Sequence, residues 1–154
     1  MSEVNPLKFI RTIIAAFLLL LLGTSCVTEQ GAEGEWKILN REVASLYQQG
    51  QYDSAVVVAK KALELAEKNV GPDHPDVAMS LNNLAELYRT QGQYVQAEPL
   101  YKRALAIYEK AFGPDHPNVA TSLNNLAELY RATNRVKEAE ELELRAAKIR
   151  SIKR

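Results

Sequence analysis

A recurring set of amide and guanidinium side chains has the chemistry to pair with a peptide group or a carboxylate. The set consists of Asn82, Asn83, Arg89, Asn124, Asn125 and Arg131. An asparagine amide carries both a donor and an acceptor, which match the two halves of a peptide group. An arginine guanidinium can meet a carboxylate through two parallel hydrogen bonds. Asparagine has a poor helix propensity, so four of them within a helical pattern point to a specific role.

The rest of the sequence offers little that could form an active site. It contains no nucleophile–base pair, no glycine-rich phosphate loop and no HExxH motif. The two histidines, His74 and His116, lie 42 residues apart in equivalent connectors, where they cannot share a metal ion. The lone cysteine, Cys26, excludes an internal disulfide and a cysteine-rich zinc site. We therefore predict that the protein is not an enzyme and has no metal or other cofactor.

Composition favours one helical domain. The protein has 154 residues, 47% of them hydrophobic, and equal numbers of basic and acidic side chains, 19 of each. This length suits a single folded domain. The zero net charge argues against nucleic acid as a partner, because nucleic-acid binders normally carry a basic excess. Alanine and leucine dominate and β-branched residues are sparse, which favours helix.

Residues 1–25 have the layout of a bacterial export signal. A polar start with Lys8 and Arg11 precedes the apolar run 12–22, and small residues follow it up to Cys26. The run is shorter than the roughly 20 residues that span a bilayer. We therefore expect a removed signal peptide, with a single retained transmembrane anchor as the alternative.

The end of this segment resembles a bacterial lipoprotein box. Residues 22–26 read LGTSC, although the family prefers leucine at the position of Gly23. The resemblance implies that Cys26 is lipidated and that residues 26–35 form a tether facing the periplasm. Val27 follows the cysteine, and by the same resemblance the absence of Asp there implies sorting to the outer membrane. The alternative is cleavage by an ordinary signal peptidase. The balanced charge predicts no attraction to anionic lipid beyond such an anchor.

A repeat of 42 residues fills the rest of the chain. Residues 71–89 return as 113–131 with 17 of 19 positions identical, and a more divergent copy lies at 39–70. Periods of this size indicate stacked supersecondary units. We predict three units, at about 36–70, 71–112 and 113–150, within a domain over 36–154.

Each copy encodes two helices joined by a tight turn. In the middle copy one apolar stripe contains Leu81, Leu84, Ala85 and Tyr88. A second contains Ala97, Leu100, Tyr101, Ala104, Leu105 and Tyr108. Gly92 separates the two, and Asn134 takes its place in the third copy, because both residues tolerate a left-handed turn. In the GPDHP connectors we predict Asp73 and Asp115 as N-caps, and Pro75 and Pro117 in the first helical turn.

This pattern resembles the tetratricopeptide repeat in the 42-residue form found in kinesin light chains. The resemblance rests on the two apolar stripes, the turn residues, the GPDHP connector and the SLNNLAELY segment, and it covers residues 36–150. It implies an all-α, right-handed superhelical solenoid whose first helices line a concave groove. Asn82 and Asn124 would point into this groove, with Arg89 and Arg131 two turns further along. Asn83 and Asn125 would either join them or bond between repeats and shape the stack.

Together these features favour a membrane-tethered scaffold of the cell envelope. Its groove would bind a peptide segment of a partner protein. The alternative is a structural or assembly protein that self-associates, or docks onto a partner, through the open ends of the helix stack. We expect Trp36 to cover the first helix pair at one of those ends. The partner and its pathway are not encoded in any motif, because repeat scaffolds share one fold across many functions.

Overall fold

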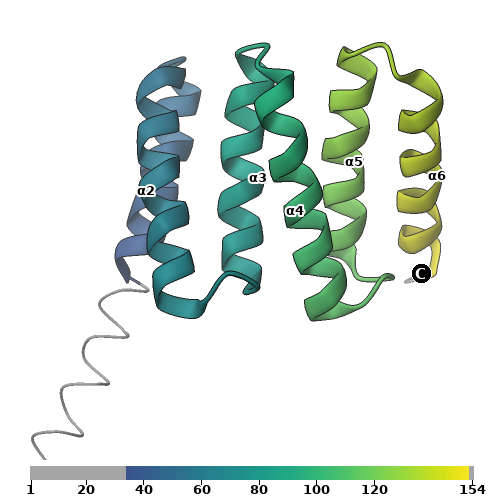
Figure 1. Ribbon diagram of the computed structural model, residues 1–154, viewed down its shortest axis with the longest axis horizontal. Helices are drawn as coiled ribbons and strands as arrows, with labels where there is room; N and C mark the ends of the chain where they lie inside the picture. The colour runs from purple at the N-terminus through teal and green to yellow at the C-terminus, as the bar shows by residue number, and fades with distance from the viewer. Residues whose placement is uncertain (1–33, 153–154) are drawn as a thin grey trace, which may run out of the picture. The chain divides into compact units, whose positions relative to one another are not determined.

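The computed structural model describes residues 34–152, which form paired α-helices (Figure 1). The first described helix covers residues 34–48. The others are α2 (Tyr52–Val70), α3 (Pro75–Thr90), α4 (Tyr94–Phe112), α5 (Pro117–Ala132) and α6 (Val136–Ile152). No strand occurs within 34–152. The predicted fold class, an all-α superhelical solenoid of about three helix pairs, is confirmed.

Helix packing gives the solenoid an inner and an outer layer. We call residues 34–48, α3 and α5 the first helices, and α2, α4 and α6 the second helices. Each second helix packs against the first helix of the next pair, as α2 does on α3 and α4 on α5. The first helices α3 and α5 also touch each other, whereas the second helices α2, α4 and α6 do not. The first helices therefore lie on the tighter, concave side of the stack.

Tight turns join the two helices of each pair. Gly50 and Gly92 both adopt φ 72°, a left-handed conformation that glycine takes without steric cost. Asn134 adopts φ 61° at the third turn and is the one non-glycine residue at positive φ within 34–152. The substitution that the sequence predicted to be tolerated therefore keeps the same turn geometry.

The connectors correct one sequence prediction. His74 and His116, not Asp73 and Asp115, are the N-caps of α3 and α5. Each imidazole Nδ1 accepts a hydrogen bond at 3.2 Å from the backbone N–H two residues later. The reason is the following proline, which pushes its predecessor into the extended conformation that a cap requires. Asp73 instead pairs with Lys110.

Small side chains allow the helices of a pair to approach closely. Ala97, Ala104 and Tyr101 are fully buried on α4, as the apolar stripe predicts. Trp36 is 8% exposed, and its Nε1 donates to Ser80 Oγ of α3 at 2.9 Å, so it is buried against the second repeat and does not cover an open end of the stack. Because Ala97 and Ala104 add little volume between the helices, α4 can pack closely on its neighbours.

Several predictions fall on residues beyond the described range. The signal peptide 1–25, lipidation of Cys26 and most of the tether 26–35 lie outside it. Among residues 34–152, no helix is long and apolar enough to cross a membrane. The same residues contain no cluster of three or more His, Cys, Asp or Glu side chains arranged to hold a metal ion.

Candidate peptide-binding groove

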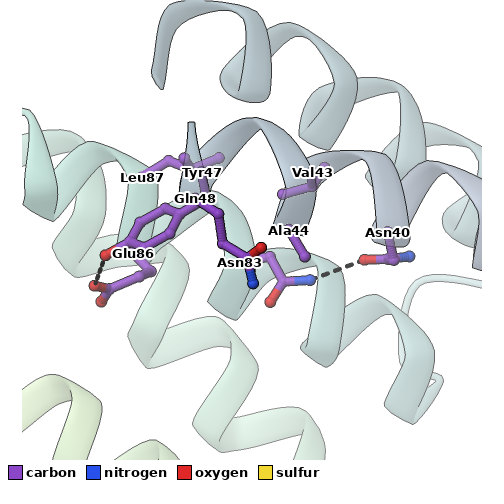
Figure 2. Close-up of a pocket in the computed structure, with 8 residues that line it drawn as sticks. All are labelled: Asn40, Val43, Ala44, Tyr47, Gln48, Asn83, Glu86 and Leu87. Carbon is purple, nitrogen blue, oxygen red and sulfur yellow. Dashed lines mark hydrogen bonds between the residues drawn. The ribbon is translucent and has the colours of Figure 1, made fainter. Parts of the chain in front are cut away.

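A groove of about 250 Å³ opens between the first described helix and α3 (Figure 2). Its lining residues are Asn40, Val43, Ala44, Tyr47, Gln48, Asn83, Glu86 and Leu87. Apolar groups make most of its surface, and a few polar groups project at its two ends. This combination suits a ligand that buries an apolar side chain and pairs its polar groups at fixed points.

An amide pair occupies one end of the groove. Asn83 Nδ2 donates to Asn40 Oδ1 at 2.8 Å (Figure 2). Asn40 Nδ2 in turn donates to the Trp36 carbonyl at 2.9 Å. Counted from the turn residues Gly50, Gly92 and Asn134, Asn40 is equivalent to Asn82 and Asn124. The equivalent pair between α3 and α5 would be Asn82 and Asn125, but Asn82 Oδ1 has no hydrogen-bond partner among the described residues. The Asn83 carbonyl oxygen and the remaining amide hydrogens are the groups that a ligand could engage.

A carboxylate that the sequence analysis missed, Glu86, lies at the other end. Its oxygens accept from Arg89 Nε at 2.9 Å and Nη2 at 2.6 Å, and from Tyr101 Oη at 2.8 Å. Tyr47 Oη donates to it at 3.4 Å from across the groove (Figure 2). Burial raises the pKa of Glu86, but the hydrogen bonds from Arg89 and Tyr101 outweigh burial, and the net pKa is lowered. Glu86 is therefore an anion that is held in place on the groove wall.

Asn82, predicted to point into the groove, is engaged between repeats. Its Nδ2 donates to Ser122 Oγ on α5 at 3.2 Å. Its Oδ1 is buried and has no hydrogen-bond partner within 34–152. Asn82 thus lies deeper in the seam between α3 and α5 than Asn83 does between the first described helix and α3. A role for Asn82 in ligand binding stays a prediction.

Both predicted arginines are paired within the chain. Arg89 joins Glu86 to Glu128 Oε2, which lies 3.4 Å from its Nη2. Arg131 forms two hydrogen bonds with Glu143, at 2.7 and 2.6 Å, and so turns toward α6. The two equivalent residues therefore serve different neighbours. Any acidic ligand would compete with these internal carboxylates.

The asparagines of the third copy differ from those of the second. Asn124 contacts the Arg150 guanidinium of α6, and its amide oxygen accepts from Nη1 at 3.1 Å when the amide is oriented oxygen-first. Asn125 is half-buried, without a side-chain hydrogen bond inside the described range. The structure therefore brings Asn83 and Arg89 to one groove and places Asn124 and Arg131 under α6.

Some of these placements carried a signal in the sequence. Asn40 repeats the position of Asn82 and Asn124 when the copies are counted from their turn residues, so an asparagine recurs there in all three copies. Glu86 recurs as Glu128, but nothing in the sequence distinguished it from a solvated glutamate. Its special character comes from Tyr47 and Tyr101, which approach from two other helices.

Comparison with known families now identifies the class of protein. The tetratricopeptide repeat family model matches residues 37–110 and 83–151. The chain belongs to the tetratricopeptide repeat family. Its members are typically protein-interaction scaffolds without catalytic activity, so a protein is the expected class of partner. A search of curated proteins gives no match.

Solved structures place the chain near kinesin-light-chain-like members. The crystal structure of BtubC (BKLC) from P. vanneervenii aligns with a TM-score of 0.71 and 28% identity, covering 75% of this chain and 46% of that one. A candidate kinesin light chain from Podosopora anserina with nearly identical TPR-like repeats aligns with a TM-score of 0.69 and 28% identity, covering 75% and 55%. The chain therefore spans about half the length of these relatives.

Proposed function

We propose that this protein is a membrane-tethered scaffold of the cell envelope that holds an extended peptide segment of a partner protein in its first groove. The observation that carries the proposal is the groove between the first described helix and α3. Its apolar floor, formed by Val43, Ala44 and Leu87, accepts one apolar side chain. The amide pair Asn40–Asn83 supplies donors and an acceptor for the adjacent main chain.

Shape and preorganisation support this assignment. Tyr47 and Glu86 are fixed by hydrogen bonds before any ligand arrives. A preformed site loses less conformational entropy on binding than one that must be assembled. Because Glu86 is anionic and already neutralised by Arg89, the groove favours an apolar or uncharged residue next to it. We expect peptides with two adjacent carboxylates to bind poorly there.

A crosslinking experiment in living cells tests the groove. A photoreactive amino acid replaces Gln48, which lines the groove and is exposed, and in a matched control it replaces Gln96, exposed on α4. We expect a discrete partner band from position 48 and none from position 96. Asn83→Ala should weaken that band while leaving the helical circular dichroism unchanged. Equal labelling from both positions would contradict the groove assignment.

The tether is a separate part of the proposal. Its support is the export-signal layout of residues 1–25 and the lipoprotein-box resemblance that ends at Cys26. Several acyl chains give a stable anchor, because each buried methylene contributes about 0.8 kcal/mol. A lipid anchor at Cys26 would place the protein on the periplasmic face of a membrane, and Val27 favours the outer membrane.

Metabolic labelling with an alkyne fatty acid tests the tether. We expect label on the wild-type chain and none on Cys26→Ala. A chain that fractionates with membranes but carries no label would support the retained transmembrane anchor instead. A chain recovered in the soluble fraction without label would argue for ordinary signal cleavage.

One observation favours self-association through an exposed apolar side chain as a second candidate function. Val57 of α2 is 54% exposed. It lies one turn before Lys61, whose counterpart Arg103 pairs with Glu67 of the preceding repeat. The equivalent residues Pro99 and Glu141 are also exposed, so Val57 lies on the outer face of the helix stack. Light scattering over a range of concentrations tests this: a rising mass that Val57→Glu abolishes supports assembly, and a constant monomer mass excludes it.

A further inference from the structure

The C-terminal half of α6 exposes two large apolar side chains on a basic background. Leu144 is 74% exposed and Ile152 is 58% exposed. They are eight residues apart, or about 12 Å along the helix. Ala147 and Lys148 lie between them and are also exposed. We call Leu144, Ala147, Lys148 and Ile152 the α6 outer face. It is separate from the groove, since α6 does not contribute to the groove lining.

Charge on this part of the chain is one-sided. After Glu143 the sequence reads LRAAKIRSIKR, which has five basic residues and no acidic one. Arg145 is paired with Glu109 at 2.6 Å, and Arg150 lies against Asn124. The Lys148 ammonium has no ion-pair partner among residues 34–152 and faces solvent. The zero net charge of the whole chain therefore conceals a local basic end.

The combination of exposed apolar groups and unpaired basic charge fits one kind of surface. We propose that the α6 outer face docks on an anionic lipid surface, with Leu144 and Ile152 entering the headgroup boundary. Helices that lie on membranes combine apolar side chains on one face with flanking lysine and arginine. A lysine between the two apolar residues can extend its charged end to the phosphate layer while its stem covers apolar surface.

This inference rests on the tether of the proposed function. Ten residues, 26–35, separate Cys26 from the folded unit. Even fully extended they reach at most about 35 Å. An anchor within that reach raises the effective concentration of lipid at the domain surface, so a face that is too weak to bind vesicles alone can dock when tethered. The docked state would fix the orientation of the domain on its membrane.

An environment-sensitive fluorophore in the full chain tests the docking. It is attached at Ala147→Cys on the α6 outer face or, as a control, at the exposed Ser54→Cys on α2, both in the lipidated chain, in which the Cys26 sulfur is a thioether and does not take the label. The full chain is reconstituted with phosphatidylglycerol or phosphatidylcholine vesicles that contain brominated lipid. We expect a blue shift and quenching at position 147 with phosphatidylglycerol only. At about 0.5 M salt, which shortens the screening length to a few Å, both signals should fall.

Two variants separate the apolar and the charge contributions. Leu144→Ser with Ile152→Ser should remove the blue shift, because both side chains are already exposed and the fold does not depend on them. Lys148→Glu should lower the docked fraction about fivefold. Circular dichroism checks that each variant folds. Equal signals with both lipids, quenching at both positions, or no blue shift at position 147 in a chain that floats with phosphatidylglycerol vesicles would overturn the proposal; a chain that does not float would instead argue against the tether. A face that binds an acidic protein segment instead would leave the vesicle signals flat.

Loss of peptide binding would leave this result unchanged, since the fluorescence reports only on α6. Failure of the groove assignment and failure of lipid docking are therefore distinguishable.

Discussion

The second and third repeats share nearly the same first helix and yet place its charged residues differently. In the second repeat Tyr101 donates to Glu86, and Glu86 holds Arg89 on the groove wall. In the third repeat Glu143 replaces Tyr101 and draws Arg131 toward α6. One substitution on the second helix is therefore enough to redirect an arginine on the first.

This difference follows from position in the stack. Tyr101 is fully buried between two repeats, whereas Glu143 is half-buried on a helix that no further described repeat covers. A carboxylate is tolerated there because solvent and Arg131 both stabilise its charge. In the third repeat the residue equivalent to Tyr101 is therefore polar and faces solvent, as expected of a repeat that no further described repeat covers. Exchanging these side chains tests the interpretation.

The largest effect is expected from Tyr101→Glu, which gives the second repeat the side chain of the third. The new carboxylate would lie in a fully buried site next to Glu86, where two like charges cannot both be solvated. We expect the free energy of unfolding to fall by about 3–5 kcal/mol. Urea denaturation followed by circular dichroism measures it. A loss below about 1 kcal/mol would mean that solvent reaches Tyr101 after all.

A smaller effect is expected from Tyr101→Phe, which removes only the hydroxyl. Glu86 would lose its 2.8 Å hydrogen bond while the ring still fills its site. Loss of a hydrogen bond to a charged group costs about 1.5–3 kcal/mol. The control is Tyr94→Phe, whose hydroxyl has no partner within 34–152. Equal urea midpoints for the two variants would argue against a structural role for the Tyr101 hydroxyl.

Acid should weaken the contact between the second and third repeats through Glu98. Lys102 donates to this carboxylate at 2.7 Å, and Arg135 and Tyr130 approach it from the next repeat at 2.9 and 3.1 Å. The Lys102 hydrogen bond, with those from Arg135 and Tyr130, lowers the pKa of Glu98 to about 2. A lowered folded-state pKa gives stability that is present above the unfolded value and lost as pH falls toward 2.

The pH prediction is tested by thermal melts between about pH 6 and 2.5, a window that spans the unfolded pKa of glutamate near 4.3. Wild type should lose stability across this window, and Glu98→Gln should lose less. Glu140→Gln changes the equivalent residue of the third repeat, which has no repeat packed against it. The pH dependence of the Glu140→Gln variant should follow that of wild type. If stability falls in parallel for all three proteins, Glu98 is not the cause of the loss in acid.

The smallest effect is expected from Glu143→Tyr, the reverse exchange. Arg131 would lose an exposed ion pair, and such pairs contribute little because solvent already stabilises both charges. The ring would cover apolar surface on α5 in return. We expect an urea midpoint close to that of wild type. A large loss would show that the Arg131–Glu143 pair holds α6 in place.

The sequence predicted the fold well because its signals are local and repeated. Each of these signals determines the structure of nearby residues only: the apolar stripes predict helices, and the turn glycines and Asn134 predict the turns between them. The structure agrees with both. The prediction that Asp73 is an N-cap was wrong because it relied only on the general preference for aspartate at N-cap positions. The backbone restriction imposed by Pro75 on His74 decided the outcome instead.

The groove was harder to predict because it depends on side chains from different repeats. Asn82 and Asn83 are consecutive residues whose side chains leave the helix about 100° apart. Which neighbour each one meets, Ser122 or Asn40, depends on how the repeats pack. Glu86 becomes a fixed groove anion only when Tyr47 and Tyr101 meet it. Such contacts join residues 15 to 43 positions apart, which helical periodicity within one repeat does not encode.

The position of the groove at one end of a linear stack has a consequence for its dynamics. In a solenoid each unit is stabilised only by its neighbours, so terminal units open more readily than internal ones. Among the described residues the first helix has a neighbouring repeat on one side only, yet it supplies five of the eight residues that line the groove. A ligand bound there would also act as a missing neighbour and slow the opening of that helix. Amide hydrogen exchange over residues 36–48 would therefore report occupancy of the groove directly.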